Sequence, residues 1–139
     1  MHAHHDQTAI TVILMQPSGH MLMQLRDNGK GKAILYPEMW CFPGGGCDPG
    51  ESPVQTVVRE IYEEFHLHVD PAQCKYISTY IHDHMDDHVY LCRIKENAKP
   101  QLHEGKAMAW KRLTGIKKIN LAWQQNQILP AIEKYIKGM

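Results

Sequence analysis

Short apolar segments separated by turn-forming residues make up much of the chain, and this pattern predicts β-strands joined by hairpins. TAITVILM (8 to 15) is rich in β-branched and apolar residues, and QPSG (16 to 19) is a turn signal before HMLMQL (20 to 25). We therefore expect these segments to form a first hairpin. The polar RDNGKGK (26 to 32) that follows is typical of a mobile loop.

A second hairpin, a further strand and a helix are predicted in the second half of the chain. YISTYI (76 to 81) and HVYLCRI (88 to 94) flank the polar HDHMDD and are expected to be two strands joined by a turn. AMAWKRL (107 to 113) is the further strand. Four apolar residues near the end recur at helical spacing: Ile128, Leu129, Ile132 and Ile136. Pro130 fits such a helix in its first turn.

The sequence between the two hairpins contains the clear beginning of an α-helix. Ser52 and Gln55 fit the S-x-x-Q capping box, and Pro53 occupies the favoured first helical position. We expect this helix to run from Pro53 to about His66. Its apolar residues fall on one stripe that should face the core: Val54, Val57, Val58, Ile61 and Phe65.

Three glutamates form a second stripe on the same helix. Glu60, Glu63 and Glu64 span about 100° of arc beside the apolar stripe, so they should emerge where the helix meets the rest of the domain. Like charges three or four residues apart on a helix repel by roughly 0.2–0.5 kcal/mol. A charge run of this kind is most often a solvated face, so a functional interpretation needs support from other residues.

Composition limits the classes of function. The 139 residues, of which 43% are hydrophobic, suit a single domain over residues 1 to 139. Lys plus Arg and Asp plus Glu are equal at 15 each, so the chain has no overall positive field that would bind a long nucleic acid. The sequence has no run of 18 apolar residues and begins without the pattern of a signal peptide. We therefore expect a cytoplasmic protein with no membrane partner.

The cysteines and the N-terminal histidines do not define a site by themselves. Cys41, Cys47, Cys74 and Cys92 form no C-x-x-C pair, which argues against a zinc ribbon or a redox motif and for reduced thiols. Residues 1 to 7 (MHAHHDQ) are expected to be disordered, although their histidines could bind a metal opportunistically.

A longer pattern changes the interpretation of the acidic stripe. Residues 45 to 67, GGCDPGESPVQTVVREIYEEFHL, fit G-x5-E-x7-R-E-U-x-E-E-x-G-U, where U is bulky and aliphatic, at every position but one. This stretch resembles the Nudix box of the Nudix hydrolase family. The departure is His66, where the pattern has glycine, and we expect a locally altered helix end with intact metal ligands. The resemblance extends to WCFPGGG (40 to 46) and to Glu104 with Trp110, as in MutT-like members.

The resemblance implies a fold, an activity and a cofactor. Nudix proteins have an α+β fold, an α/β/α sandwich with a mixed sheet. They hydrolyse a nucleoside diphosphate linked to a further group X, which yields a nucleoside monophosphate and phosphorylated X. Mg²⁺ or Mn²⁺ is the expected cofactor, since Mg²⁺ commonly binds through a few carboxylates plus substrate phosphate oxygens. The expected partner is a small nucleotide, and the protein would be a monomer or a homodimer.

The resemblance also implies roles for residues in and near the box. The expected metal ligands are Gly44, through its backbone carbonyl, and the three glutamates of the helix: Glu60, Glu63 and Glu64. Arg59 would brace these glutamates, and a plain helix pair with Glu63 is the alternative. Glu51 is expected to brace the loop more than to bind metal. Glu104 is either a further ligand or general base, or a solvated loop residue.

Substrate contacts are expected from three further residues, Arg26, Phe42 and Asn126. Arg26 could touch phosphate, or it could be a solvated loop arginine. Asn126 would read a purine, because its amide can both donate to and accept from a base edge. Trp123 could stack nearby or belong to the core. These placements favour a nucleoside triphosphate as the substrate, including one with an oxidised purine.

Three alternatives stay open. The loop RDNGKGKAILYPEMW (26 to 40) could frame a sugar nucleotide such as ADP-ribose. A domain of this fold could also bind a nucleotide or partner without catalysis. The segment HDHMDDH (82 to 88) could sense a transition metal through imidazole and carboxylate groups, or it could be a hairpin tip with His82 and His84 on one strand face. As a hairpin tip it could still help to grip X.

Overall fold

One mixed sheet of seven strands organises residues 7–139, the part of the chain that the computed structural model describes. The strands are β1 (Thr8–Met15), β2 (Met21–Leu25), β3 (Trp40–Cys41), β4 (Gly44–Gly46), β5 (Cys74–His82), β6 (Met85–Arg93) and β7 (Ala107–Lys111). The helices are α1 (Pro53–Phe65), α2 (Leu113–Ile116) and α3 (Leu129–Lys137), with the 3₁₀ helices η1 (Pro71–Gln73) and η2 (Ala122–Ile128). The strand order is β3-β2-β1-β6-β5, with β4 paired to β1 and β7 paired to β2.

Both predicted hairpins are confirmed, and one parallel pair makes the sheet mixed. β1 pairs with β2, and β5 with β6, in antiparallel fashion, whereas β1 and β6 are parallel. β5 and β6 are longer than predicted, because their pairing continues to His82 and Met85 beside the turn. β7 ends at Lys111, two residues earlier than predicted, since Leu113 already begins α2.

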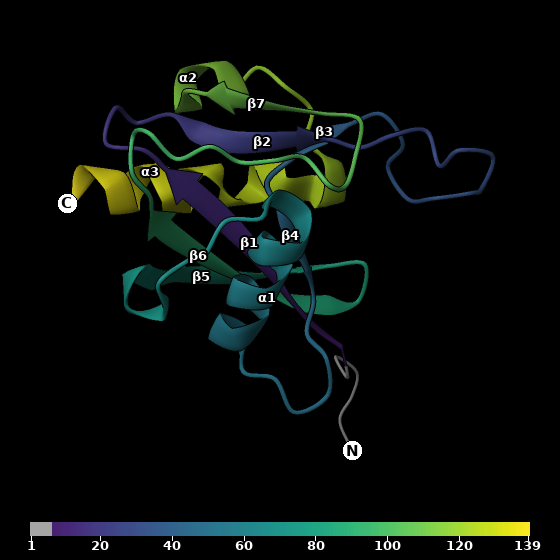
Figure 1. The fold of residues 1–139 in the computed structure, drawn as a ribbon, viewed down its shortest axis with the longest axis horizontal. Coiled ribbons are helices and arrows are strands. Elements are labelled where there is room, and N and C mark those ends of the chain that lie inside the picture. Colours follow the sequence, from purple (N-terminus) through teal and green to yellow (C-terminus); the bar gives the residue numbers. More distant parts are fainter. Residues whose placement is uncertain (1–6) are drawn as a thin grey trace.

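Helices cover both faces of the sheet, with α1 on one side and η2 and α3 on the other (Figure 1). Successive residues of β1 point to opposite faces. Ile10 and Val12 belong to a buried cluster with Ile61 of α1, whereas Ile13 belongs to a second cluster with Ile132 of α3. The expected α+β fold, an α/β/α sandwich with a mixed sheet, is confirmed.

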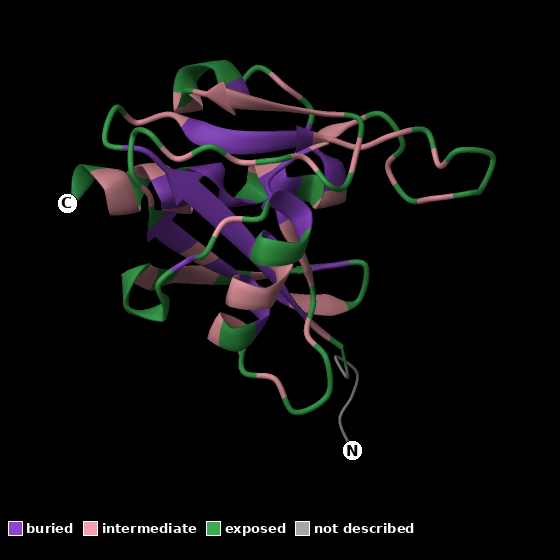
Figure 2. Ribbon diagram, in the orientation of Figure 1, coloured by how far each residue is buried: buried purple, intermediate pink, exposed green. Residues whose placement is uncertain are grey.

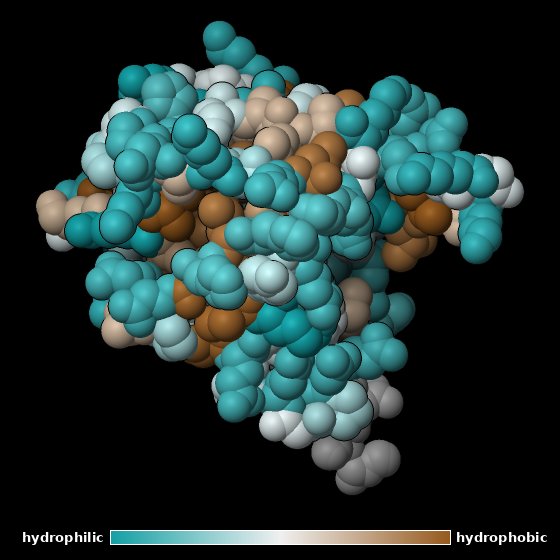
Figure 3. Space-filling view, viewed as in Figure 1, coloured by the Kyte–Doolittle hydropathy of each residue, from teal (hydrophilic) through white to brown (hydrophobic). Residues whose placement is uncertain are grey.

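Burial follows these layers. β1 and β2 are buried over nearly all of their length (Figure 2). On α1, the predicted apolar stripe is buried at Val57, Ile61 and Phe65 and half-buried at Val54 and Val58. Hydrophilic residues dominate the outer face on which α1 lies (Figure 3). The helix therefore presents one side to the core and its other side to the solvent.

The sheet opens at the start of β1, and this opening positions the site. β2 pairs with β1 at Met15 and Met21, beside their turn. At the other end of β1, residues 9–11 pair with the glycines of β4, and the far end of β2 pairs with β3 and β7. The two central strands thus diverge, and the segment 40–46 lies between their ends.

The turn of the second hairpin differs from the prediction. Asp83 and His84 both have positive φ, 47° and 63°, in the two positions between β5 and β6. Two-residue hairpin turns favour positive φ, which Asp and His tolerate better than most residues do. The prediction that His84 shares a strand face with His82 is therefore wrong. His82 ends β5 and is only 4% exposed.

Two further expectations concern the chain ends and the membrane. The expected disorder of residues 1 to 7, and metal binding by the histidines there, lie outside the described residues except at Gln7. The backbone oxygen of Gln7 accepts a hydrogen bond from the backbone N–H of Asp86. Within residues 7–139, no helix is long and apolar enough to cross a membrane.

Helix α1 begins as predicted. The Ser52 hydroxyl accepts a hydrogen bond from the Gln55 N–H at 3.2 Å, and the Gln55 side chain accepts one from the Ser52 N–H at 2.8 Å. Pro53 is the first helical residue. These reciprocal bonds satisfy two N–H groups that have no partner within a helix. The helix that carries the acidic stripe is thus fixed at its N-terminal end.

We expect Ser52→Ala to lower the free energy of unfolding by about 1 kcal/mol, because the N–H of Gln55 loses its acceptor. Urea unfolding followed by circular dichroism measures this change. An unchanged unfolding free energy would show that the capping box does not hold the helix end.

Candidate active site

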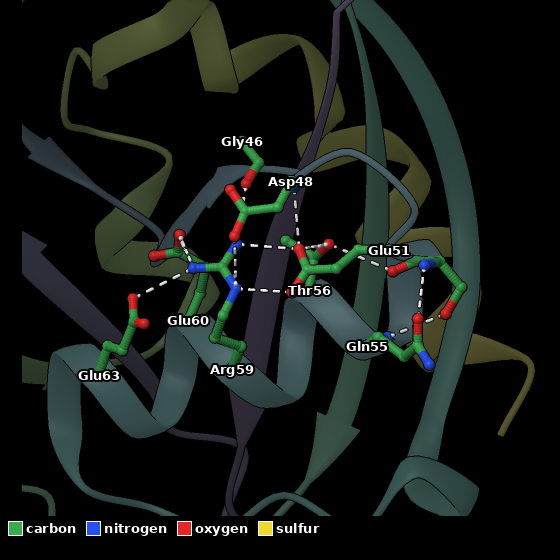
Figure 4. Close-up of polar contacts among 9 residues, drawn as sticks. Gly46, Asp48, Glu51, Gln55, Thr56, Arg59, Glu60 and Glu63 are labelled. Atoms are coloured by element: carbon green, nitrogen blue, oxygen red, sulfur yellow. Dashed lines mark hydrogen bonds and ion pairs between the residues drawn. The ribbon is translucent and has the colours of Figure 1, made fainter.

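Arg59 is the centre of the polar contacts on the outer side of α1 (Figure 4). Its guanidinium pairs with both oxygens of Glu51, from Nε at 2.7 Å and from Nη2 at 3.0 Å. Nη1 donates to Glu60 at 3.0 Å and to Glu63 at 3.1 Å. Nη2 also donates to the backbone oxygen of Gly46 at 3.1 Å. One cation therefore donates to three carboxylates, forms an ion pair with a fourth, that of Asp48, at 3.5 Å, and ties the helix to β4.

Glu51 is committed to the structure of the loop before α1. Besides Arg59, its carboxylate accepts hydrogen bonds from the backbone N–H of Asp48 at 2.9 Å and the hydroxyl of Thr56 at 2.8 Å. The hydrogen bond from Arg59, followed by that from Asp48, lowers the pKa of Glu51 to about 2. This geometry is that of a loop brace.

Glu64 differs from its neighbours because it is buried. It is 2% exposed, whereas the side chains of Glu60 and Glu63 are 16% and 56% exposed. Its Oε2 atom is buried and has no hydrogen-bond partner among the described residues. Burial, followed by the neighbouring carboxyl groups of Glu60 and Glu104, raises the pKa of the Glu64 carboxyl. A carboxylate in this setting needs a cation or a proton.

The glutamates do not form a complete set of metal ligands in this arrangement. In residues 7–139, no group of three or more His, Cys, Asp or Glu side chains is arranged to hold a metal ion. Glu60 and Glu63 are turned to Arg59 instead. The unpartnered oxygen of Glu64 nevertheless fits a divalent cation, which takes oxygen ligands and often shares its remaining positions with substrate phosphate and water.

Two glycines of β4 allow close approach at this place. A methyl group on Gly45 would lie 2.5 Å from the carboxylate of Glu60, and one on Gly44 would collide with the backbone oxygen of Ile10. Gly45 pairs directly with Ile10 of β1. Glycine thus leaves room for a carboxylate against the strand, where any other residue would fill the space.

The loop before β7 is fastened to both the helix and β2. The backbone N–H of His103 donates to the backbone oxygen of Glu64 at 2.9 Å, and the Gln24 side chain donates to the backbone oxygen of Glu104 at 2.6 Å. Gly105 has φ of 90°, and a side chain there would meet the backbone of Leu25 at 2.8 Å. Burial and the charge of Glu60 raise the pKa of Glu104. Glu104 is therefore fixed beside the acidic helix.

His66 ends the helix in the conformation that glycine commonly supplies. Its φ is 54°, and its N–H donates to the backbone oxygen of Tyr62 at 2.8 Å. The expected alteration of the helix end is therefore wrong, because histidine adopts the left-handed conformation itself. The His66 ring stacks on His103, with ring centroids 3.7 Å apart.

A cavity of about 330 Å³ joins part of the acidic region to apolar side chains. It lies where β1 and β2 diverge. Six residues expected to have a role line it: Gly44, Glu64, Glu104, Arg26, Phe42 and Trp123. Glu60, Glu63 and Arg59 are not part of its lining. The structure thus separates the buried glutamate, which faces the cavity, from the two that bind Arg59.

Trp123 belongs to the cavity wall and is held there by two neighbours. The guanidinium carbon of Arg26 lies 4.3 Å from the ring centroid, and the Tyr36 ring lies 5.5 Å away. Arg26 also donates from Nε to the backbone oxygen of Leu35 at 3.0 Å. These contacts hold residues 35 and 36 of the loop after β2 against the wall of the cavity.

Asn126 is placed differently from our expectation. Its Nδ2 donates to the backbone oxygen of Ile119, and its Oδ1 accepts from the N–H of Leu121, each at 2.8 Å. It does not line the cavity, and its amide is already engaged at both ends. Its neighbour Gln125 lines the cavity and accepts a hydrogen bond from the N–H of Phe42 at 2.8 Å. A purine-reading role for Asn126 thus lacks support from its position.

The cavity also contains Thr11, which sequence reasoning missed, and residues of the second hairpin, for which it left a role in gripping X open. Thr11 of β1 and three residues of the second hairpin, His82, Met85 and Asp87, line the cavity. The hairpin residues belong to the segment HDHMDDH, whose sequence pattern indicates either a metal site or a hairpin tip. The parallel pairing of β1 with β6, which brings this hairpin beside Thr11, was not visible in the sequence.

The profile of the NUDIX domain matches residues 5–132 of the sequence. The chain belongs to the NUDIX domain family. Helix α1 and the glutamates that cluster around Arg59 are therefore part of a NUDIX domain.

Curated relatives match parts of this NUDIX domain. An 8-oxo-dGTP diphosphatase from Proteus vulgaris is 40% identical over 52 residues, which cover 37% of this chain and 45% of the relative. Diphosphoinositol polyphosphate phosphohydrolase 2 from Mus musculus is 55% identical over 29 residues, which cover 21% of this chain and 16% of the relative. The matched segments thus span less than half of either relative. Both names are those of hydrolases, as expected for a Nudix-type hydrolase.

Solved structures share the whole fold. A MutT protein from Methanosarcina mazei Go1 has a TM-score of 0.74 at 18% identity, over 94% of this chain and 95% of the other. An Ap4A hydrolase from C. elegans has a TM-score of 0.74 at 20% identity, over 95% and 100%. At such low identity this likeness shows the fold alone.

We expect Gly45→Ala to weaken Mg²⁺ binding to this NUDIX domain while leaving its stability within about 1 kcal/mol, because the methyl group displaces only the end of the Glu60 side chain. Gly44→Ala is the matched control, since its methyl group meets the backbone of Ile10. It should lower the free energy of unfolding by about 1–3 kcal/mol. Calorimetric Mg²⁺ titration and urea unfolding measure the two effects. Equal destabilisation by both substitutions would contradict this interpretation.

We expect the stability of the Glu51→Gln variant to decrease less in acid than that of the wild type. The pKa of Glu51 is about 2 in the folded protein, against an ordinary value of 4.5. Ionised Glu51 therefore contributes stability above its ordinary pKa, and this contribution is lost as the pH falls towards the folded value. Urea midpoints measured at several pH values between about 5 and about 2.5 should drop less in Glu51→Gln than in the wild type. Parallel curves would refute the assignment.

Proposed function

We propose that this NUDIX domain is a pyrophosphohydrolase that depends on Mg²⁺ or Mn²⁺. It cleaves a nucleoside diphosphate linked to X into a nucleoside monophosphate and phosphorylated X, and its preferred substrate is a nucleoside triphosphate. One observation carries the proposal: Glu64, with its unpartnered buried oxygen, lines the same cavity as Phe42 and Trp123. A nucleotide in this cavity would have its phosphates near the cation at Glu64 and its base near the rings of Phe42 and Trp123.

The glutamates and Gly44 supply the cation site in this proposal. Mg²⁺ held by Glu60, Glu63, Glu64 and the Gly44 carbonyl would neutralise phosphate charge, orient the pyrophosphate and lower the pKa of a water molecule. Glu60 and Glu63 have to turn from Arg59 to take part. The ion pair with Glu51 would hold Arg59 in place during that change, because Glu51 binds Nε and Nη2, whereas Glu60 and Glu63 bind Nη1.

Glu104 is the candidate general base. It lines the cavity with Glu64, and its raised pKa makes its carboxylate a better proton acceptor than an ordinary glutamate. Its loop is held by the hydrogen bond from Gln24 to the backbone oxygen of Glu104 and by the one from His103 to the end of α1. In the reaction it would accept the proton of the attacking water.

Arg26 and Phe42 are the proposed substrate contacts. Arg26 lies over the ring of Trp123 at the cavity wall and carries a positive charge suited to phosphate. Phe42 is 1% exposed and offers an apolar surface, and Gln125 fixes its backbone. The 8-oxo-dGTP diphosphatase among the relatives supports a nucleoside triphosphate over a nucleotide sugar.

The remaining parts of the proposal concern the whole protein. We place the domain in the cytoplasm, with support from its cysteines, all four of which are free thiols. The domain occupies residues 1 to 139, and it acts on small nucleotides rather than on long nucleic acids or membranes. It works as a monomer or a homodimer.

The decisive experiment measures nucleoside monophosphate release by chromatography from a panel of substrates with and without Mg²⁺ or Mn²⁺. The panel contains ordinary and oxidised nucleoside triphosphates, ADP-ribose and nucleotide sugars. We expect turnover of triphosphates that requires the cation. Turnover of the sugar nucleotides alone would show that the substrate is a sugar nucleotide and not a nucleoside triphosphate. No turnover by folded protein would favour a binding module.

We expect Glu64→Gln to reduce this turnover about a hundredfold or more, because it removes a proposed cation ligand. Its stability should equal or exceed that of the wild type, since a neutral amide replaces a buried carboxyl that resists ionisation. Glu133→Gln is the control. Glu133 lies on α3, pairs with Lys117 and does not line the cavity. Loss of activity in both variants, or in neither, would contradict the role of Glu64.

A further inference from the structure

The cavity contains a polar group that the proposed reaction does not use. Asp87 of β6 lines the cavity, and its side chain is 5% exposed. The Thr11 hydroxyl donates to its Oδ1 at 2.8 Å, and His82 Nε2 lies 2.7 Å from its Oδ2. All three residues line the cavity and come from the sheet rather than from α1.

His82 is fully engaged by two carboxylates. Its Nδ1 lies 2.9 Å from Asp83 Oδ2, on the side away from Asp87. An ionised carboxylate only accepts hydrogen bonds, so a ring nitrogen of His82 that carries a proton donates to the aspartate beside it. Burial alone would lower the pKa of His82, but the hydrogen bonds and charges of Asp87 and Asp83 outweigh it and raise the pKa. His82 thus has no free nitrogen for a metal, and it balances the charge of Asp87.

Asp87 keeps unused capacity to accept hydrogen bonds. Two carboxylate oxygens offer about four lone-pair sites, and Thr11 and His82 occupy two of them. Its polar neighbour in the lining, Gln125, is already bound to Phe42: its Oε1 accepts from the N–H and its Nε2 donates to the backbone oxygen at 3.5 Å. Asp87 therefore lines the cavity with acceptor capacity left for a ligand.

The surroundings of Asp87 suit a flat ring. Ile10, Phe42, Met85 and Trp123 contribute apolar surface to the same cavity. Such walls complement the faces of a nucleobase, whereas a sugar would leave its hydroxyl groups against apolar side chains. A base between these walls would bring its polar edge to the few polar groups available.

We propose that Asp87 selects the base of the substrate by accepting hydrogen bonds from two adjacent N–H groups, as guanine presents on its ring nitrogen N1 and its 2-amino group. The proposal rests on the proposed function, since it concerns the nucleotide whose phosphates reach Glu64. Adenine, cytosine and uracil place an acceptor beside the donor on this edge, where it would face the lone pairs of Asp87. Oxidation at position 8 leaves the guanine edge unchanged, so guanine and 8-oxoguanine satisfy Asp87 equally.

The first test uses the wild-type protein and compares kcat/KM for dGTP and dITP, which differ only in the 2-amino group. We expect dGTP to be preferred by about tenfold or more, because dITP leaves one buried acceptor unpaired. GTP and ITP complete the set. Equal kcat/KM for dGTP and dITP overturns the proposal. A preference for both ribonucleotides over their deoxy forms, without a guanine preference, overturns it too, because Asp87 would then read sugar hydroxyls.

The second test uses a pair of variants. Asp87→Asn replaces one acceptor with a donor, so the ratio of kcat/KM for dGTP to that for dITP should fall to within about threefold of one. Asp83→Asn is the matched control, since Asp83 binds the same histidine but does not line the cavity. It should keep the wild-type ratio. A fall of this ratio towards one in both variants would overturn the proposal, because base selection would then depend on the hydrogen bonds of the hairpin in general and not on Asp87.

A third measurement separates this proposal from the proposed function. Calorimetry of dGMP and dIMP binding to the metal-free protein requires no catalysis. Tighter binding of dGMP by about tenfold or more supports base selection even if no substrate is turned over. Metal-dependent turnover of triphosphates with equal binding of dGMP and dIMP would uphold the enzyme and overturn the role of Asp87.

Discussion

The repulsion among carboxylates gathered at α1 is the constraint on which the rest of the site depends. Arg59 neutralises part of it by holding Glu51, Glu60 and Glu63 with a single guanidinium. Glu64 is left buried with one oxygen unpaired among the described residues. A solvated acidic face would have no reason to bury one member of the run. The arrangement instead suits a divalent cation, which would satisfy Glu64 and draw its neighbours from Arg59.

The sheet supplies what the helix cannot. Because β1 and β2 diverge from their turn, the start of β1 pairs with the glycines of β4, and a cavity remains beside them. The parallel pairing of β1 with β6 brings the second hairpin to the same place. Glu64 from the helix and a base-sized apolar space from the strands thus share one cavity, although they lie far apart in the sequence.

The sequence was sufficient to predict α1, its capping box and its acidic stripe, because these depend on contacts within a few residues. It was insufficient where a side chain finds a distant or unforeseen backbone partner. Asn126 is engaged by the backbone of residues 119 and 121, and His84 takes a turn position with positive φ. Cys74 and Cys92 face each other across β5 and β6, with their sulfur atoms 3.0 Å apart, a proximity that only strand register determines.

The most direct test of the central claim is a titration of metal-free protein with Mn²⁺, followed by electron paramagnetic resonance of the free ion. Wild-type protein and Glu64→Gln are compared at equal concentration, without nucleotide. The account predicts that the wild type removes free Mn²⁺ from solution and that Glu64→Gln removes far less. Equal Mn²⁺ binding by the two proteins, or none by the wild type, would contradict the claim that Glu64 is buried there to hold a cation.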